Sequence, residues 1–159
     1  MLLIQNVGEE MKSCFLFGHG DCPESMLPKI EAAVEACYSG HGIAAFYVGN
    51  RGRFDGLAAT AVKRAKQRHP DICLYLLLAY HPAERPVDLQ SCFDGSFYPP
   101  LEDTPRQYTI VKANRYMVRT ADALICYVCH PGNTRKLLEF ARRQQKERGI
   151  PLNNLASHD

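Results

Sequence analysis

Short glycine-containing turns carry the residues of this chain that could hold a ligand, and the first of them is Gly18-His19-Gly20-Asp21. Its two glycines allow a close approach of the backbone to a ligand, or a positive φ. The imidazole of His19 can donate a hydrogen bond to a phosphate or to a ribose. The alternative interpretation is a tight turn with a surface histidine, and the segment by itself favours neither.

The second turn, residues 49–56, lies between an apolar run and a segment with helical spacing. Backbone N–H groups and the helix dipole at such a junction favour an anion. Arg51 or Arg53 can clamp a phosphate with paired donors, and Asp55 can cap the helix, contact a ribose hydroxyl, or do both. The alternative is a capped turn with solvated arginines. Gly49 opens the turn, but the G-x-G-x-x-G fingerprint of a standard NAD site is missing, and we assign no cofactor.

The third turn, residues 130–135, again joins an apolar run to a helix start. Asn133 or Thr134 can cap that helix, and the N–H groups left free after Gly132, together with the threonine hydroxyl, can hold a phosphate. The alternative is a simple Pro-Gly turn with a cap. Two such turns on one edge of a sheet indicate an anion site more strongly than either does alone.

A basic stripe runs along the segment 106–120, where Lys112, Arg115 and Arg119 recur at helical spacing. Arg115, or Asn114 beside it, can reach a ligand if the start of this helix faces the site. We expect Lys112 and Arg119 to lie in solvent.

Seven cysteines raise the question of metal or thiol chemistry. Their odd number and their positions in apolar runs favour buried, reduced thiols over a disulfide framework. Cys126-Tyr-Val-Cys129-His130 matches the C-x-x-C-H string of haem attachment. A separation of three along a strand points the two thiols to opposite faces, so we predict no metal site. Cys22 lies near a helix start without an evident base, and is a weak candidate nucleophile.

The composition excludes several classes of function. The chain has 159 residues, of which 46% are hydrophobic and 23% charged, with a formal net charge of +2. That balance provides no broad field for DNA or for an anionic membrane, so any anion site must be local. The apolar stretch 1–7 is too short for a secretory signal, and no run approaches the length of a membrane span. We therefore expect a cytoplasmic protein.

Apolar runs alternate with helical patterns along most of the chain. We expect strands at 14–17, 43–48, 72–80 and 123–128, and a short edge strand at 150–152. We expect helices from 23–25 to about 38, over 55–68 and 106–120, and from 132–134 to near 149. This order predicts a three-layer, Rossmann-like, doubly wound α/β sheet, mostly parallel, with four to five strands. Ligands of such folds bind beyond the carboxyl ends of the strands, where the strand order reverses.

Residues 81–105 break the alternation. They contain five prolines, several acidic groups and aromatic residues. A connector of this length without structure is unusual in a compact domain. We therefore expect an irregular, proline-rich excursion, or a lid, within a single domain spanning 1–159.

Several segments, taken together, resemble the SLOG superfamily, and within it the YpsA-like group of small proteins. They are Phe17-Gly18-His19-Gly20, residues 46–66 with Phe54-Asp55, residues 112–141 with Asn114-Arg115-Tyr116, and Gly149-Ile150-Pro151. The resemblance implies a Rossmann-like fold that binds nucleotides or their derivatives, with the ligand against the following residues: Gly18, His19, Gly49, Asp55, Arg115, Gly132 and Thr134.

The chain also departs from the family pattern. Gly20 stands where the group tends to have arginine, and a single Gly132 replaces paired glycines. In the Lonely Guy pattern a glutamate stands where this chain has Leu137. The carboxylate proposed for phosphoribohydrolase chemistry is thus missing, and whether the chain is an enzyme stays open.

Three functions compete on these observations. The first is binding or sensing of a nucleotide or ADP-ribose-like ligand through its phosphate, at the following residues: Gly18, His19, Gly49, Arg51, Asp55, Arg115, Gly132, Asn133 and Thr134. The second is hydrolysis of an N-glycosidic or phosphate bond, with Asp55, Asp21 or Glu139 as the carboxylate and His19 as proton donor. The third, nucleic-acid binding, is disfavoured by the small net charge. A homo-oligomer is expected only by analogy with other proteins of this fold.

Overall fold

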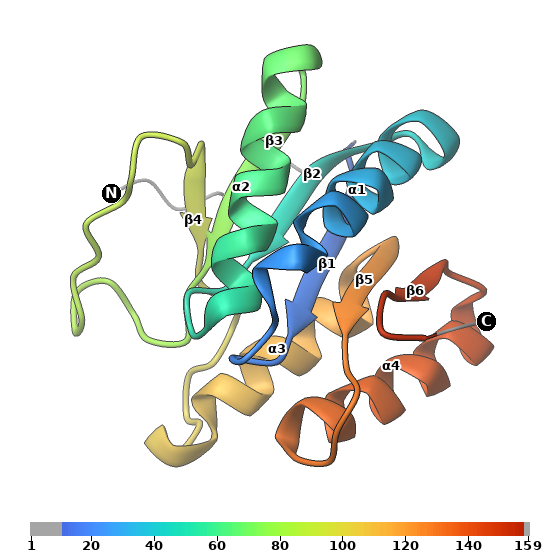
Figure 1. The fold of residues 1–159 in the computed structure, drawn as a ribbon. Coiled ribbons are helices and arrows are strands. Elements are labelled where there is room, and N and C mark those ends of the chain that lie inside the picture. The colour runs from blue at the N-terminus through green and yellow to red at the C-terminus, as the bar shows by residue number, and fades with distance from the viewer. Residues whose placement is uncertain (1–10, 158–159) are drawn as a thin grey trace.

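Six parallel strands form one sheet in the order β4-β3-β2-β1-β5-β6 in the computed structural model, which describes residues 11–157 (Figure 1). The strands are β1 (Lys12–Gly18), β2 (Ile43–Val48), β3 (Cys73–Leu77), β4 (Gly95–Phe97), β5 (Ala123–Tyr127) and β6 (Leu152–Asn154). The predicted doubly wound α/β sheet is confirmed. Its strand number exceeds the expected four to five because β4, an edge strand of only three residues, was not expected. The stretch 1–7, considered above as a secretory signal, lies outside the described residues.

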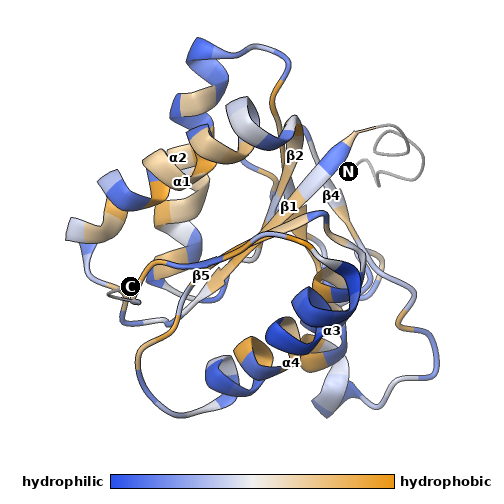
Figure 2. Cartoon of the chain, turned by 90° about the vertical axis from the view of Figure 1, so that its right-hand side faces the viewer, coloured by the Kyte–Doolittle hydropathy of each residue, from blue (hydrophilic) through white to orange (hydrophobic). Residues whose placement is uncertain are grey.

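Helices cover both faces of the sheet (Figure 2). They are α1 (Leu27–His41), α2 (Arg53–Arg68), α3 (Thr109–Thr120) and α4 (Asn133–Arg148), with short 3₁₀ turns η1 (Glu24–Met26) and η2 (Arg106–Tyr108) before α1 and α3. Buried side chains of α1 and α2 form one apolar core against the sheet, and those of α3 and α4 form the other. Within residues 11–157, no helix is long and apolar enough to cross a membrane.

Strand β1 shows why the central strands are continuous apolar runs. Successive side chains of a strand point to opposite faces, and both faces of this sheet are covered. Cys14 and Leu16 pack in the α1–α2 core, whereas Phe15 and Phe17 pack in the α3–α4 core. All four residues are buried, which is the pattern of a parallel sheet between two helical layers.

The strand order reverses beside β1. The chain passes from β1 through α1 to β2 on one side, and reaches β5, on the other side of β1, only after β4. Gly18, the last residue of β1, lies opposite Tyr127, the last residue of β5. The carboxyl ends of these two strands therefore flank the switch point at which α/β folds bind ligands.

The sequence predicted that the proline-rich segment 81–105 would be irregular. In the structure, part of this segment forms the short strand β4. Strand β4 pairs in parallel with β3. The carboxylate of Asp94 supports this edge: its Oδ2 accepts hydrogen bonds from the Leu74 amide at 2.7 Å and from Lys66 Nζ at 2.6 Å. A strand of three residues is too short to show a period, which is why the sequence pattern did not reveal it.

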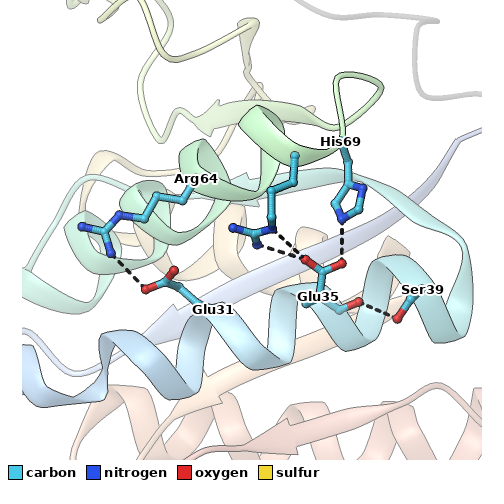
Figure 3. Close-up of polar contacts among 6 residues, drawn as sticks. Glu31, Glu35, Ser39, Arg64 and His69 are labelled. Atoms are coloured by element: carbon cyan, nitrogen blue, oxygen red, sulfur yellow. Dashed lines mark hydrogen bonds and ion pairs between the residues drawn. The ribbon is translucent and has the colours of Figure 1, made fainter.

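Polar contacts connect α1 to α2 on the outer surface (Figure 3). Glu31 Oε1 pairs with Arg64 Nη1 at 3.1 Å. Glu35 Oε1 pairs with Arg68 Nη2 at 3.0 Å, and Glu35 Oε2 lies 2.7 Å from His69 Nε2. The hydrogen bonds from Arg68, and then from His69, hold the pKa of Glu35 below its ordinary value. Such exposed pairs contribute little singly, and the two apolar cores hold the helices on the sheet.

Candidate functional site

The first two glycine turns are packed directly against each other. A Cβ atom placed on Gly52 would lie only 2.5 Å from the Cα of Gly20. The Arg53 amide donates a hydrogen bond to the Gly20 carbonyl at 3.1 Å. The turn after β1 and the turn after β2 therefore form one continuous wall, which a side chain at position 52 would push apart.

Gly18 lies directly beneath an aromatic ring. A Cβ atom at this position would lie 2.5 Å from Cγ of Phe54, whose side chain is fully buried. The absence of a side chain at Gly18 thus allows the start of α2 to pack against the end of β1. Close packing explains this glycine without a ligand, although Gly18 also lines the pocket described below.

Asp55 does not cap α2, so the predicted N-cap is wrong. The helix begins at Arg53, and the N-cap position is held by Gly52. Asp55 instead reaches back, and its Oδ2 accepts a hydrogen bond from the Arg51 amide at 2.8 Å. Burial raises the pKa of Asp55 above its ordinary value, and the hydrogen bonds from the Arg51 and Gly52 backbone oppose this shift. The carboxylate therefore shapes the turn that carries Arg51.

The predicted cap of α4 is wrong as well. Its N-cap is Gly132, at φ +137°, and no side chain makes a capping hydrogen bond there. Asn133 and Thr134 are instead the first residues of the helix. The positive φ favours glycine at position 132. Gly132 has no side chain that could accept from the first N–H groups of α4, which leaves these groups available to an anion.

One pocket of about 490 Å³ gathers most of the predicted site at the switch point. Phe15 and Phe17 place it on the α3–α4 side of the sheet, because both pack in that core. Seven of the nine predicted residues line it, namely Gly18, Gly49, Arg51, Asp55, Arg115, Asn133 and Thr134. Residues from three different crossovers therefore converge at one edge of the sheet.

His19 and Gly132 do not line this pocket. His19 is buried, with 4% of its surface exposed. Its Nε2 lies 2.9 Å from the Cys129 amide and 3.2 Å from the His130 amide. Since Nε2 accepts both hydrogen bonds, the ring proton sits on Nδ1. The predicted phosphate donor thus holds the turn after β5 in place.

An apolar wall of the pocket was missed by the sequence analysis. Tyr108 is 52% exposed and Val111 43% exposed, and these are the exposed large hydrophobic side chains among residues 11–157. Both line the pocket, together with Ile110 and Leu137. A sequence signal for this wall was present in the segment 106–120, which also carries the basic stripe. Tyr108 and Val111 are three residues apart, a spacing that places two side chains on one face of a helix.

Positive charge dominates the polar lining. Arg51, Arg115 and Lys136 line the pocket, and Asp55 is the one carboxylate among its described lining residues. The Arg115 guanidinium lies 5.0 Å from the centroid of the Phe140 ring, a cation–π contact that holds the side chain in place.

Several other polar candidates lie outside the pocket. Lys112 and Arg119 are exposed, as predicted. Of the three carboxylates considered for hydrolysis, Asp21 and Glu139 are exposed and do not line the pocket. Only Asp55 remains as a candidate acid or base.

Cys126 and Cys129 do not share a strand as the sequence had suggested, because β5 ends at Tyr127. Cys126 is buried in the α3–α4 core, and Cys129 is exposed. Burial raises the pKa of Cys22 to about 11, which disfavours the thiolate that a nucleophile requires.

His19, Cys129 and His130 form a cluster that the sequence analysis missed, with one potential ligand atom from each lying within 4.8 Å of the others. The two imidazole rings are stacked, at an angle of 9° between their planes. Ring lone pairs lie in the ring planes, so stacked rings do not aim them at one ion, and His19 Nε2 is already engaged by two amides. This geometry is therefore poor for chelation.

No protein-family model matches the chain, and no curated protein matches it. The fold and the pocket define the class: an α/β protein of Rossmann-like architecture with a basic, partly apolar pocket at its switch point. The resemblance to the SLOG superfamily remains a prediction from the sequence.

Proposed function

We propose that the switch-point pocket binds a nucleotide-derived ligand through its phosphate. The observation that carries this proposal is the convergence of Arg115 and the uncapped start of α4 on a pocket with an exposed apolar wall. The SLOG resemblance points to the same class of ligand.

The phosphate end of the ligand fits the start of α4. Asn133 and Thr134 offer backbone N–H groups that have no side-chain cap, and the Thr134 hydroxyl adds a further donor. Arg115 can add a charge-assisted hydrogen bond from α3. Lys136 contributes further positive charge along the same wall.

The nucleoside end fits the apolar wall of the pocket. Tyr108, Ile110 and Val111 present apolar surface at the start of α3. A planar base covers such surface favourably, since aromatic stacking adds to the burial of apolar area. A volume of about 490 Å³ is in the usual range for small-molecule sites.

Binding or sensing is favoured over catalysis. Hydrolysis of an N-glycosidic or phosphate bond requires an acid and a base placed at the scissile bond. Among the residues that the structure describes, Asp55 is the one carboxylate lining the pocket, and its Oδ2 is engaged by the Arg51 amide. His19, the proposed proton donor, does not line the pocket and is bonded to the turn after β5.

Calorimetry against a panel of nucleotides and ADP-ribose tests this proposal. Arg115→Gln is expected to weaken binding by about tenfold or more, the effect of losing a hydrogen bond to a charged group. Arg119→Gln is the matched control, since Arg119 lies on the same helix, is exposed, and does not line the pocket. Absence of binding across the panel, or equal losses in the two variants, would overturn the proposal.

A further inference from the structure

A second basic cluster lies beside the pocket, around the ring of Tyr80. The guanidinium carbon of Arg85 lies 4.0 Å from the ring centroid, that of Arg51 lies 5.5 Å away, and that of Arg106 lies 5.7 Å away. These four residues are called the Tyr80 cluster below. They come from three separate segments, namely the turn after β2, the segment after β3, and η2.

The Tyr80 cluster carries more positive than negative charge. Glu84 Oε1 pairs with Arg106 Nη1 at 2.6 Å. Within the described part of the chain, no other carboxylate forms an ion pair with the three arginines. Asp55 also interacts electrostatically with Arg51, so three guanidinium groups facing two carboxylates leave one positive charge in excess. Guanidinium groups repel one another, so gathering them around one ring favours an anion between them.

The cluster is continuous with the pocket. Arg51 belongs to the cluster and also lines the pocket. Tyr108, which forms part of the apolar wall, is the last residue of η2, and Arg106 is the first. Asn133, at the start of α4, also lines this pocket, although it comes from a different part of the chain. A ligand that fills the pocket can therefore contact α4 and Arg51 at the same time.

We propose that the Tyr80 cluster binds a second phosphate group of the ligand. The ligand class is then a nucleotide with at least two phosphate groups, one at the start of α4 and one between Arg51, Arg85 and Arg106. This inference rests on the proposed function and narrows its ligand. The segment that follows β3 acquires a specific role, because it supplies Tyr80, Glu84 and Arg85.

A purely structural role for the cluster makes a different prediction. If the arginines only hold the segment 81–86 against Tyr80, their removal lowers the melting temperature and affects all ligands equally. If they bind a phosphate, their removal affects only ligands that carry the additional phosphate.

The experiment compares AMP with ADP and with adenosine 3′,5′-bisphosphate by calorimetry on the full chain. The unaltered protein is expected to bind at least one of the two multiply phosphorylated ligands about tenfold more tightly than AMP. In the double variant Arg85→Gln/Arg106→Gln, this advantage is expected to disappear while AMP affinity stays the same. The matched control is Arg64→Gln/Arg68→Gln, which removes two exposed arginines of α2 that pair with Glu31 and Glu35.

If the double variant folds poorly, a second variant tests the same phosphate site. Glu84→Gln removes the neutralising carboxylate from the cluster, and is expected to strengthen binding of the multiply phosphorylated ligand severalfold without changing AMP affinity. AMP binding with no gain from an additional phosphate would overturn the inference but leave the proposed function intact. Failure of every nucleotide to bind the unaltered protein would overturn both.

Discussion

The rings of His19 and His130 are stacked, with their centroids 3.6 Å apart. The two imidazoles play opposite electrostatic roles. Burial, and then the positive charge of His130, lower the pKa of His19. The carboxylate of Asp21, 3.2 Å from His130 Nε2, and the Pro131 carbonyl raise the pKa of His130. In this pair, His19 favours its neutral form and accepts hydrogen bonds, whereas His130 favours its charged form.

His19→Phe is expected to destabilise the fold, because it keeps an aromatic ring against His130 but removes the acceptor of two amides. The loss should be about 1–3 kcal/mol in the free energy of unfolding, measured by urea denaturation at neutral pH. His41→Gln serves as the control, since His41 is exposed at the end of α1. Unchanged stability in His19→Phe would show that the two hydrogen bonds contribute nothing.

The pH dependence of stability should separate the two histidines. His19 has a lowered pKa, so its contribution is present above the unfolded value of about 6.5 and is lost as the pH falls below it. His130 has a raised pKa, so its contribution is present below about 6.5 and is lost as the pH rises through its folded value. His130→Asn is expected to remove this alkaline-side loss while keeping the acid-side loss. Asp21→Asn should reduce the alkaline-side loss in the same denaturation series; a profile unchanged in both variants would refute the assignment.

Gly18→Ala is expected to destabilise the protein, because the new Cβ would lie 2.5 Å from the Phe54 ring. Overpacking of this kind costs about 1–3 kcal/mol. Gly56→Ala is the matched control: it lies within α2, and a Cβ added there would meet nothing within 4 Å beyond the backbone of its own helix. This control should gain up to about 1 kcal/mol from helix propensity. Thermal denaturation of both variants checks the prediction, and equal melting temperatures would contradict it.

Asp55→Asn distinguishes binding from hydrolysis. Under the proposed function, removal of the Asp55 charge from the lining strengthens phosphate binding severalfold, while the amide oxygen can still accept a hydrogen bond from the Arg51 backbone. Under the hydrolase alternative, the same variant loses product formation. Calorimetry and product analysis on the same preparation decide between these results. Weaker binding without any product from the unaltered chain would contradict both.

Local pattern was enough to predict the central part of the fold. The run Ile43–Val48 is β2 with the expected bounds, and the helix expected over 55–68 begins only two residues earlier. Both predictions rest on interactions within a few residues: apolar continuity in a buried strand, and helical spacing ended by Pro70. The strands farther from the centre were less predictable, since β3 ends at Leu77 rather than residue 80 and β6 spans Leu152–Asn154 rather than 150–152.

The order of apolar runs and turns along the chain was sufficient to establish which turns follow the central strands, and hence that Gly18, Gly49 and the start of α4 lie at one edge of the sheet. The role of each side chain there emerged only from the folded arrangement. His19 accepts from amides 110 and 111 residues away, Phe54 covers Gly18, and Tyr80 gathers three arginines from separate segments. Such roles depend on contacts between residues distant in the chain, and periodicity, which reports only on near neighbours, carries no information about them.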